Sequence, residues 1–504
     1  MRRLVMVGLV ALGCVVIAAG LTVAQQPNTS PIVTTIADCG PLMRQVPPLI
    51  DVNGDDSAII GDCTGTHLGI LDLANGRTVE TMALIQQLYT YSSLPVVAVD
   101  PPEHRLYALC ESAPPMSGIE AVALDAYDTL SGRRVRSIPL GNNLDTAEVV
   151  VDPRADRVLV LLVTSAAMSI EAFDERHTRL MYTTVVQTGS SEGLANPARL
   201  VLAVKADHMF IPSTIDDRVS VLDTRTGRVL RTLAPSASYP YRSTDGMTPL
   251  LDDRNKRLYT TSQWGQLNTA AQGGSHTLLN VFDSFDGRLL SRTAIYSYTY
   301  FPTIVLAERT RRLYVLSAAG INVLNASTGR SITTLKAPFA LNEGFFRVAF
   351  DQQRQRLVIG DYATETVAAW DDVSDRLLYA VNLHQHSFLD DLGIVSRTGR
   401  ILVMTGISSP RPVYPDLPNS LIVLDGRTGM MQKVVRLGFG EGHIIVSGRT
   451  QRALAVVPGQ SIVTESTGWG WIPSWVRRWL PFLPSATRSH TVTAHLTVID
   501  TSRL

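Results

Sequence analysis

The sequence predicts an all-β fold that is built from repeated four-stranded antiparallel sheets. A turn signature, in which an Asp ends an apolar run and an Arg follows five residues later, recurs about every 50 residues along the 504-residue chain. The apolar runs are short and rich in β-branched residues, which is typical of strands. No segment shows a sustained apolar period of 3.6 residues, so we expect little helix.

The turn signature has a simple chemical reading as a β-hairpin. The Asp carboxylate accepts hydrogen bonds from the turn, and the Gly found in most copies reaches a positive φ without strain. The Arg then opens the next antiparallel strand. The copies are Asp72/Arg77, Asp128/Arg133, Asp174/Arg179, Asp223/Arg228, Asp283/Arg288, Asn325/Arg330 and Asp371/Arg376. Asp425 keeps Gly429 but has Met430 in place of Arg, and Asp500 begins a ninth copy.

Each repeat also contains an earlier hairpin. Residues 95–100 form one apolar run, 101–104 form a polar turn, and 105–109 form a second run. The same plan recurs before Arg157, Arg257, Arg312 and Arg356. Two hairpins per repeat give four antiparallel strands, and such repeats are typical of the blades of a β-propeller.

The repeats resemble those of a known family. Units such as VVAVDPPEHRLYAL and VSVLDTRTGRVLRTL are similar to the YVTN-type propeller repeats of exported bacterial proteins, and to the wider quinoprotein-like and lactonase-like propellers. The resemblance covers roughly residues 45–504 and implies a propeller. Pyrroloquinoline-quinone dehydrogenases carry a Trp soon after the repeat Gly, and the positions after Arg228 and Arg330 hold none.

We expect one propeller of eight or nine blades, with seven as the alternative. The last repeat has three strand-like runs, and residues 31–37 (PIVTTIA) would supply the fourth. Strands from both termini would then close the ring and cover its exposed edges.

The N-terminus predicts export. Arg2 and Arg3 precede an apolar run over residues 4–24, which is a signal peptide or an N-terminal membrane anchor. A third interpretation of this N-terminal segment is a lipidation site at Cys14. Residues 25–44 would form a linker with the closing strand, and 45–504 the propeller, extracellular or membrane-anchored and facing outside. Cys39 and Cys63 are a candidate disulfide, and Cys110 a buried thiol.

A Trp-rich insertion interrupts the last repeat at about residues 461–489. Three readings stay open: it folds over its own propeller, contacts a lipid surface, or binds a partner protein. Trp favours the membrane interface, where its ring is apolar and its N–H stays wet. The residues concerned are Trp469, Trp471, Trp475, Arg477, Arg478 and Trp479.

Candidate metal ligands are few. Asp51, Asn53 and Asp55 resemble the start of a calcium loop, although Asp56 stands where that loop requires Gly. His384 and His386 lie on one face of an extended segment, close to Asp390 and Asp391. Polar turns explain both patterns as well. We therefore expect no cofactor, with Ca²⁺ as the metal that the first pattern would hold.

The expected function is a non-enzymatic binding or scaffold module at the cell surface. The 45 basic and 45 acidic residues balance, which argues against nucleic acid as a partner. No nucleophile elbow or phosphate-binding loop occurs. The partner would be a protein or a small molecule at a propeller face, or a membrane surface. The alternative is a hydrolase or lactonase-like enzyme with a metal-dependent site at the central channel.

Overall fold

A computed structural model of the chain describes much of the sequence. The described residues are 32–39, 49–50, 57–61, 67–72, 77–83, 87–88, 97–111, 121–142, 144–176, 178–188, 200–213, 218–234, 249–264, 276–296, 303–317, 320–339, 346–362, 364–384, 388–406, 420–437, 443–446, 452–457, 461–462, 490–491 and 494–500. Within them there is no α-helix, and the one 3-10 turn is η1 (Val204–Ala206). The prediction of an all-β fold is confirmed.

Six four-stranded antiparallel sheets each use four consecutive strands and have described side chains. They are β11(Thr146–Asp152), β12(Arg157–Val163), β13(Ala167–Asp174), β14(Leu180–Thr188); β15(Val201–Ala203), β16(His208–Pro212), β17(Val219–Asp223), β18(Val229–Leu233); β19(Leu250–Asp252), β20(Arg257–Trp264), β21(His276–Asp283), β22(Leu289–Tyr296); β23(Ile304–Ala307), β24(Arg312–Ser317), β25(Gly320–Asn325), β26(Ser331–Leu335); β27(Phe346–Asp351), β28(Arg356–Asp361), β29(Thr366–Asp371), β30(Leu377–Asn382); and β31(Phe388–Val395), β32(Arg400–Gly406), β33(Ser420–Asp425), β34(Met431–Arg436).

Three further sheets are also described. A seventh sheet with described side chains has five strands: β6(Gln87–Leu88), β7(Val97–Asp100), β8(Arg105–Glu111), β9(Ala121–Asp128) and β10(Arg134–Asn142). Two more are described mainly by their strand pairing: β2(Leu49–Ile50), β3(Ser57–Gly61), β4(His67–Asp72), β5(Arg77–Ala83); and β35(His443–Val446), β36(Arg452–Val457), β39(Ala494–Asp500), β1(Ile32–Cys39). The short strands β37(Ser461–Ile462) and β38(His490–Thr491) pair with each other at the ends of the Trp-rich insertion.

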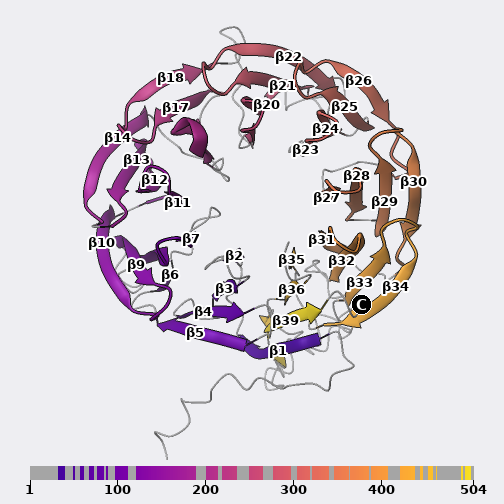
Figure 1. Cartoon of the computed structure of the whole chain (residues 1–504), viewed down its shortest axis with the longest axis horizontal. Coiled ribbons are helices and arrows are strands. Elements are labelled where there is room, and N and C mark those ends of the chain that lie inside the picture. The colour runs from indigo at the N-terminus through magenta and orange to yellow at the C-terminus, as the bar shows by residue number, and fades with distance from the viewer. Residues whose placement is uncertain are drawn as a thin grey trace, which may run out of the picture.

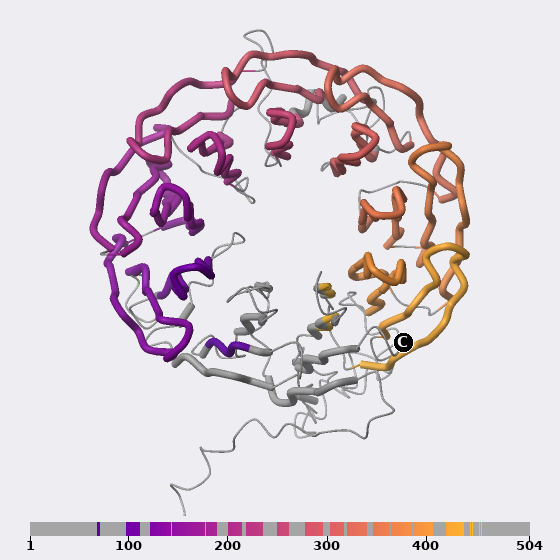
Figure 2. The backbone as a smooth tube through the Cα atoms, viewed as in Figure 1, coloured from indigo at the N-terminus to yellow at the C-terminus, as the bar shows by residue number. Residues whose placement is uncertain are grey.

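The sheets stand side by side around a common centre, as the ribbon and the tube show (Figures 1 and 2). The first strand of each sheet, such as β11 or β27, lies toward the centre, and the fourth, such as β14 or β30, lies at the outside (Figure 1). This radial arrangement of four-stranded antiparallel sheets is a β-propeller. The predicted fold class is therefore confirmed.

One sheet combines strands from the two ends of the chain. β1 pairs antiparallel with β39, which pairs with β36 and through it with β35. The segment 31–37 was predicted to supply this fourth strand, and β1 covers Ile32–Cys39. Closure of the whole ring through this sheet stays a prediction.

Burial explains why some strands are apolar throughout and others alternate. β9 and β12 are buried along nearly all of their length, whereas β10 and β14 at the outside alternate or are exposed. A middle strand is covered on both faces by the neighbouring sheets, so both sets of its side chains are apolar. An outer strand is covered on one face only, which gives the alternating pattern.

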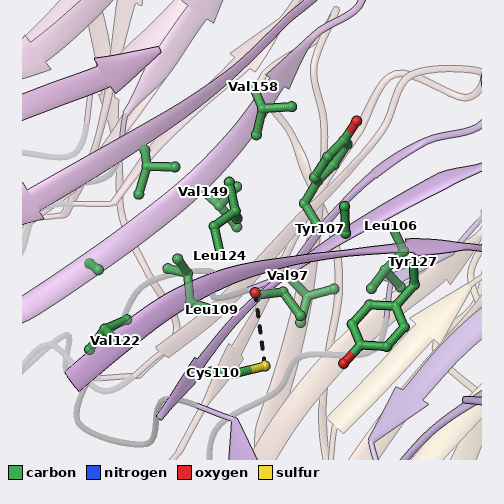
Figure 3. Packing of buried hydrophobic residues seen from close by; sticks show 14 of the residues in the cluster. Val97, Leu106, Tyr107, Leu109, Cys110, Val122, Leu124, Tyr127, Val149 and Val158 are labelled. Atoms are coloured by element: carbon green, nitrogen blue, oxygen red, sulfur yellow. Dashed lines mark hydrogen bonds between the residues drawn. The ribbon is translucent and has the colours of Figure 1, made fainter. Parts of the chain in front are cut away.

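The hydrophobic core lies between neighbouring sheets. One cluster joins Leu106, Tyr107 and Leu124 of the β6–β10 sheet to Val149 and Val158 of the β11–β14 sheet (Figure 3). Cys110 in the same cluster is a free, buried cysteine, as predicted, and its thiol lies 3.9 Å from the Ala108 carbonyl oxygen. The apolar layers between sheets therefore hold the turns in fixed positions around one face.

Candidate functional site

The repeated Asp residues organise the turns between the third and fourth strands. In the Asp223 turn, the backbone N–H of Asp223 donates to the Arg228 carbonyl (3.0 Å), and that of Gly227 donates to the Asp223 carbonyl (2.9 Å). The Asp223 carboxylate accepts hydrogen bonds from the N–H groups of Arg225 (2.9 Å) and Thr226 (2.8 Å). The same first bond joins Asp128 to Arg133, Asp174 to Arg179, Asp283 to Arg288, Asn325 to Arg330, Asp371 to Arg376 and Asp425 to Met430.

The Arg of the turn signature ends the turn and does not open the next strand in six of the seven copies. The prediction is therefore wrong for Arg133, Arg179, Arg228, Arg288, Arg330 and Arg376, where the fourth strand begins one residue later, and it is correct for Arg77, the first residue of β5. The six side chains are exposed, and the backbone carbonyl accepts the bond that closes the turn. Met430 supplies the same carbonyl, so this bond does not require an Arg side chain.

The hydrogen bonds in these turns also keep the Asp carboxylates charged. The hydroxyl of Ser131 donates to Asp128 (2.8 Å) and lowers the pKa of that carboxyl, helped by the Ser131 backbone N–H. The hydroxyl of Ser374 does the same for Asp371. Asp72 and Arg77 are described as paired strand residues only.

A second, unpredicted relationship joins the repeat Asp residues to the Arg that opens the second strand. Arg105 lies opposite Asp128, Arg157 opposite Asp174 and Arg257 opposite Asp283 in the strand register. Their side chains form ion pairs at 3.4, 3.9 and 3.1 Å, respectively. The repeat Asp therefore braces the neighbouring strand as well as its own turn.

Neighbouring sheets are joined by tyrosine hydroxyls. Tyr107 donates to the carbonyl of Glu175 (3.1 Å), and Tyr259 donates to that of Ala326 (2.8 Å). Each acceptor follows the repeat Asp or Asn of the next sheet. Tyr182 and Tyr379, on fourth strands, donate to the carbonyls of Thr224 (2.7 Å) and Gly426 (3.2 Å), and Tyr314 donates to the side-chain carboxylate of Asp372. The recurrent Arg-Leu-Tyr at 105–107, 257–259 and 312–314 is the sequence signal for three of these contacts.

At one junction two buried carboxyl groups face each other. Asp100 and Glu175, from neighbouring sheets, are each 2% exposed. Both oxygens of the Glu175 carboxyl and Asp100 Oδ1 are buried away from solvent. Burial, and then the neighbouring Asp100, raise the pKa of Glu175 to about 9. The pair therefore holds a proton at neutral pH.

The turns of seven sheets gather on one face of the ring, which we call the turn face. Strands alternate in direction, so the turns after the first and third strands lie on the same edge of each sheet. The turn face consists of residues 101–104, 153–156, 204–207, 253–256, 308–311, 352–355, 396–399, 129–133, 175–179, 224–228, 284–288, 326–330, 372–376 and 426–430.

The turn face is basic although the whole chain is neutral. The seven turns between first and second strands contain eight basic and five acidic residues, and the seven between third and fourth strands contain nine and four. The strand residues that flank these turns add ten Asp and seven Arg, so the turn face together with its strand ends contains 24 basic and 19 acidic residues. The exposed part of this face therefore attracts anions.

Two polar clefts open on the turn face. The first, the Arg309 cleft, is a hollow of about 530 Å³ lined by Arg254, Asn255, Glu308, Arg309, Arg311 and Gln352. Arg311 donates to Asn255 Oδ1 (2.9 Å), and Gln352 donates to the Leu306 carbonyl (2.8 Å). Turns of three successive sheets are thus tied together around it.

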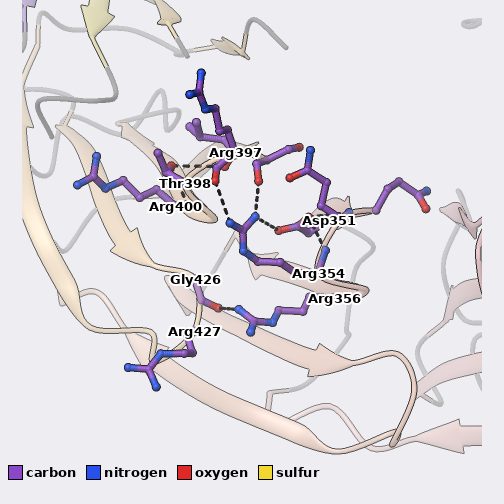
Figure 4. A network of polar contacts seen from close by, with 12 residues as sticks. Asp351, Arg354, Arg356, Arg397, Thr398, Arg400, Gly426 and Arg427 are labelled. Carbon is purple, nitrogen blue, oxygen red and sulfur yellow. Dashed lines mark hydrogen bonds and ion pairs between the residues drawn. The ribbon is translucent and has the colours of Figure 1, made fainter. Parts of the chain in front are cut away.

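The second, the Arg427 cleft, is a hollow of about 470 Å³ between the β27–β30 and β31–β34 sheets. It is lined by Arg354, Arg356, Thr398, Gly399, Arg400, Asp425, Gly426, Arg427 and Gln432. Arg354 bridges Asp351 (3.3 Å) and the Arg397 carbonyl (3.0 Å), and Arg356 donates to the Gly426 carbonyl (2.8 Å) (Figure 4). The guanidinium groups of Arg400 and Arg427 extend away from Arg354 on the same side of this network (Figure 4).

Most of the predicted site residues lie outside the described residues. These are Asp51, Asn53, Asp55, His386 and the Trp-rich insertion with Trp469, Trp471, Trp475, Arg477, Arg478 and Trp479, as well as residues 1–24 and Cys63. His384 is exposed and has a positive φ of 52°. The nearby Asp391 carboxylate accepts a hydrogen bond from the Ile444 N–H of the next sheet (2.8 Å).

The described residues contain neither a metal-binding cluster nor a membrane-spanning helix. No group of three or more His, Cys, Asp or Glu side chains there could hold a metal ion. In the same part of the chain, no helix is long and apolar enough to cross a membrane.

Comparison with known proteins finds similarity in fold only. No family model and no curated protein matches it. Among solved structures it is similar to BamB from Moraxella catarrhalis, with 15% identity over 76% of this chain and 96% of that chain and a TM-score of 0.46. It is also similar to a eukaryotic initiation factor, with 11% identity, coverage of 77% and 87%, and a TM-score of 0.50.

A third similar structure is the quinohemoprotein alcohol dehydrogenase from Comamonas testosteroni. Its identity is 10%, the coverage is 92% of this chain and 75% of that chain, and the TM-score is 0.45. Likeness at these identities concerns the fold alone, because a propeller hosts many unrelated functions. The chain is a β-propeller protein.

Proposed function

We propose that this protein is an exported, non-enzymatic propeller that acts as a binding or scaffold module and docks acidic protein surfaces on its turn face. One observation carries the proposal. The turns of this face contain 17 basic and nine acidic residues, whereas the whole chain has 45 of each. Positive charge is therefore enriched in the turns of this face.

The physical properties of the turn face suit a docking surface. Binding residues are commonly placed on loops that a rigid scaffold positions. Here the Asp223 carboxylate fixes its own turn, and the hydrogen bond from Tyr259 to Ala326 ties the turn 326–330 to the neighbouring sheet. Arg is enriched at protein interfaces, and complementary charge speeds association and selects partners.

The cellular setting belongs to the same proposal. Residues 1–24 would export the chain as a signal peptide or hold it at the membrane as an anchor, with the propeller outside. The resemblance of the repeats to those of exported YVTN-type proteins supports this part of the proposal. Mass measurement of the secreted or membrane-extracted protein tests this part: a chain that is recovered from the cytoplasm with Met1 retained contradicts it.

We also propose that the Trp-rich insertion contacts a lipid surface, and a separate experiment tests this contact. Flotation with anionic liposomes is compared for the protein with and without residues 466–484. Flotation that depends on these residues supports lipid contact. Equal flotation of the two proteins rejects it and leaves the docking surface unaffected.

Binding to polymers of opposite charge tests the docking surface. The purified protein is passed over immobilised long poly-L-glutamate and poly-L-lysine at increasing salt. We expect retention on polyglutamate that weakens with salt, because exposed charges are screened. Equal retention on polylysine contradicts an acidic partner, and a tightly held stoichiometric metal ion by elemental analysis contradicts a non-enzymatic module.

A further inference from the structure

The Arg309 cleft and the Arg427 cleft are neighbours on the turn face. Both contact the turn 352–355, the first through Gln352 and the second through Arg354. Together they run over the rims of four consecutive sheets, from β19–β22 to β31–β34. Seven arginines line them, against Glu308 and Asp425 as the only acidic lining residues described.

We propose that the two clefts form one continuous site for an extended acidic segment of a partner protein. This inference rests on the proposed function and names the part of the turn face that carries it. A globular partner would contact the face broadly, whereas two polar hollows separated by a single turn fit a chain that lies across that turn. The charge of the lining requires carboxylates on that chain.

The arginines divide into those that are held and those that face outward. Arg354 and Arg311 are fixed by hydrogen bonds to Asp351 and Asn255, respectively. Arg309 and Arg427 are exposed, and among the described residues neither guanidinium makes a hydrogen bond or an ion pair. A guanidinium presents a planar fork that matches a carboxylate, so each is ready to take one from a ligand.

The ion pairing of the Arg427 cleft also differs from that of other sheets. Arg105, Arg157 and Arg257 each pair with the Asp opposite them. The equivalent Arg356 lies opposite Asp371, where it helps the Ser374 hydroxyl to lower the pKa of that carboxyl, and it also donates to the Gly426 carbonyl of the next sheet. Its guanidinium is therefore shared between Asp371 and the edge of the cleft.

The test uses fluorescein-labelled decaglutamate and fluorescence anisotropy. An extended ten-residue chain spans up to about 33 Å, which is long enough to lie across more than one sheet rim. The variant Arg309→Ser/Arg427→Ser removes one outward arginine from each cleft. The matched control, Arg133→Ser/Arg228→Ser, removes two exposed arginines from the turn face outside the clefts. Thermal unfolding verifies that both variants fold.

We expect the cleft variant to bind decaglutamate at least tenfold more weakly than the wild type, and the control to stay within about threefold. Equal weakening of both variants overturns the site and leaves the basic docking surface in place. If the wild type binds long polyglutamate but not decaglutamate, the cleft site is overturned and the basic docking surface stays in place. If the wild type binds neither polymer, the proposed function is overturned as well. Displacement by inorganic phosphate beyond that of chloride at equal ionic strength assigns the clefts to phosphate and overturns the acidic segment.

Discussion

Arg257 opens β20 directly opposite Asp283, the last residue of β21, and Arg257 Nη1 lies 3.1 Å from Asp283 Oδ2. The other oxygen of the same carboxylate accepts the backbone N–H groups of Phe285 (2.9 Å) and Asp286 (3.2 Å). One side chain thus fixes a turn and the neighbouring strand together. This dual contact explains why an Asp recurs at the end of the third strand.

Substitution of Asp283 separates the two contacts. Asp283→Asn keeps an oxygen for the turn, as Asn325 does in the next sheet, and loses only the charge pairing. We expect Asp283→Ala to destabilise the protein by about 1–2 kcal/mol, the usual cost of losing such a cap, and Asp283→Asn to cost less than half of that. Thermal unfolding measures both. Equal losses would show that the turn hydrogen bonds contribute nothing.

The contact of the Asp with its own turn could be predicted from sequence, whereas its ion pair with the Arg of the neighbouring strand could not. The Asp and the Arg five residues later belong to one turn, so their spacing is visible as a repeat. The exact start of the next strand was misplaced by one residue, as at Arg288, because a backbone carbonyl rather than the side chain closes the turn. Arg257 lies 26 residues before Asp283, and the loop between them has a different length in each repeat. Their meeting depends on strand register, which sequence spacing alone does not determine.

Gly227 tests the conformation of the repeat turn. Its φ is +73°, and a Cβ added there would lie 2.3 Å from Tyr182 Cδ2. Gly141 also has a positive φ, +125°, but a Cβ there would meet nothing within 4 Å. We expect Gly227→Ala to cost about 1–3 kcal/mol more than Gly141→Ala, because overpacking adds to the backbone strain. Similar unfolding temperatures for the two variants would contradict this account.

The tyrosine hydroxyls test the joints between sheets. Tyr259→Phe removes the hydrogen bond to Ala326 and leaves a buried carbonyl without that donor. We expect a loss of about 1–2 kcal/mol. Thermal unfolding followed by far-ultraviolet circular dichroism compares Tyr259→Phe with the wild type, and equal stability of the two proteins would refute the role of the hydroxyl.

The Asp100–Glu175 junction predicts a dependence of stability on pH. Burial next to Asp100 raises the pKa of Glu175 to about 9 from an ordinary value of 4.5. The folded protein therefore holds a proton that the unfolded chain releases above pH 4.5. The stability contributed by this proton is fully present below about pH 4.5 and is lost as the pH rises toward about 9.

Glu175→Gln removes the titrating group while preserving its size. We expect its unfolding temperature to fall less than that of the wild type as the pH rises from 5 to about 9. Asp286→Asn, a change at an exposed acidic residue of another turn, should follow the wild type. A Glu175→Gln curve parallel to that of the wild type would show that the junction holds no such proton.

The two arginine-lined clefts could not be predicted from the sequence either, because they too depend on how the strands and sheets are arranged in space. The arginines of the two clefts come from four separate repeats, from Arg254 to Arg427, and no one segment of the sequence contains them all. Their accumulation appears only when the sheets place the turns on one face. Net charge of the chain hides it, since the basic turns are balanced elsewhere in the sequence.

The central claim is that the turn face binds acidic ligands through its two clefts. Hydrogen–deuterium exchange of the full chain with and without decaglutamate tests this claim most directly. We predict slower exchange of the backbone N–H groups in the turns 308–311, 352–355 and 426–430, with the turns 129–133 and 224–228 unchanged. Slower exchange confined to other parts of the chain, or no change anywhere under saturating peptide, would contradict the account.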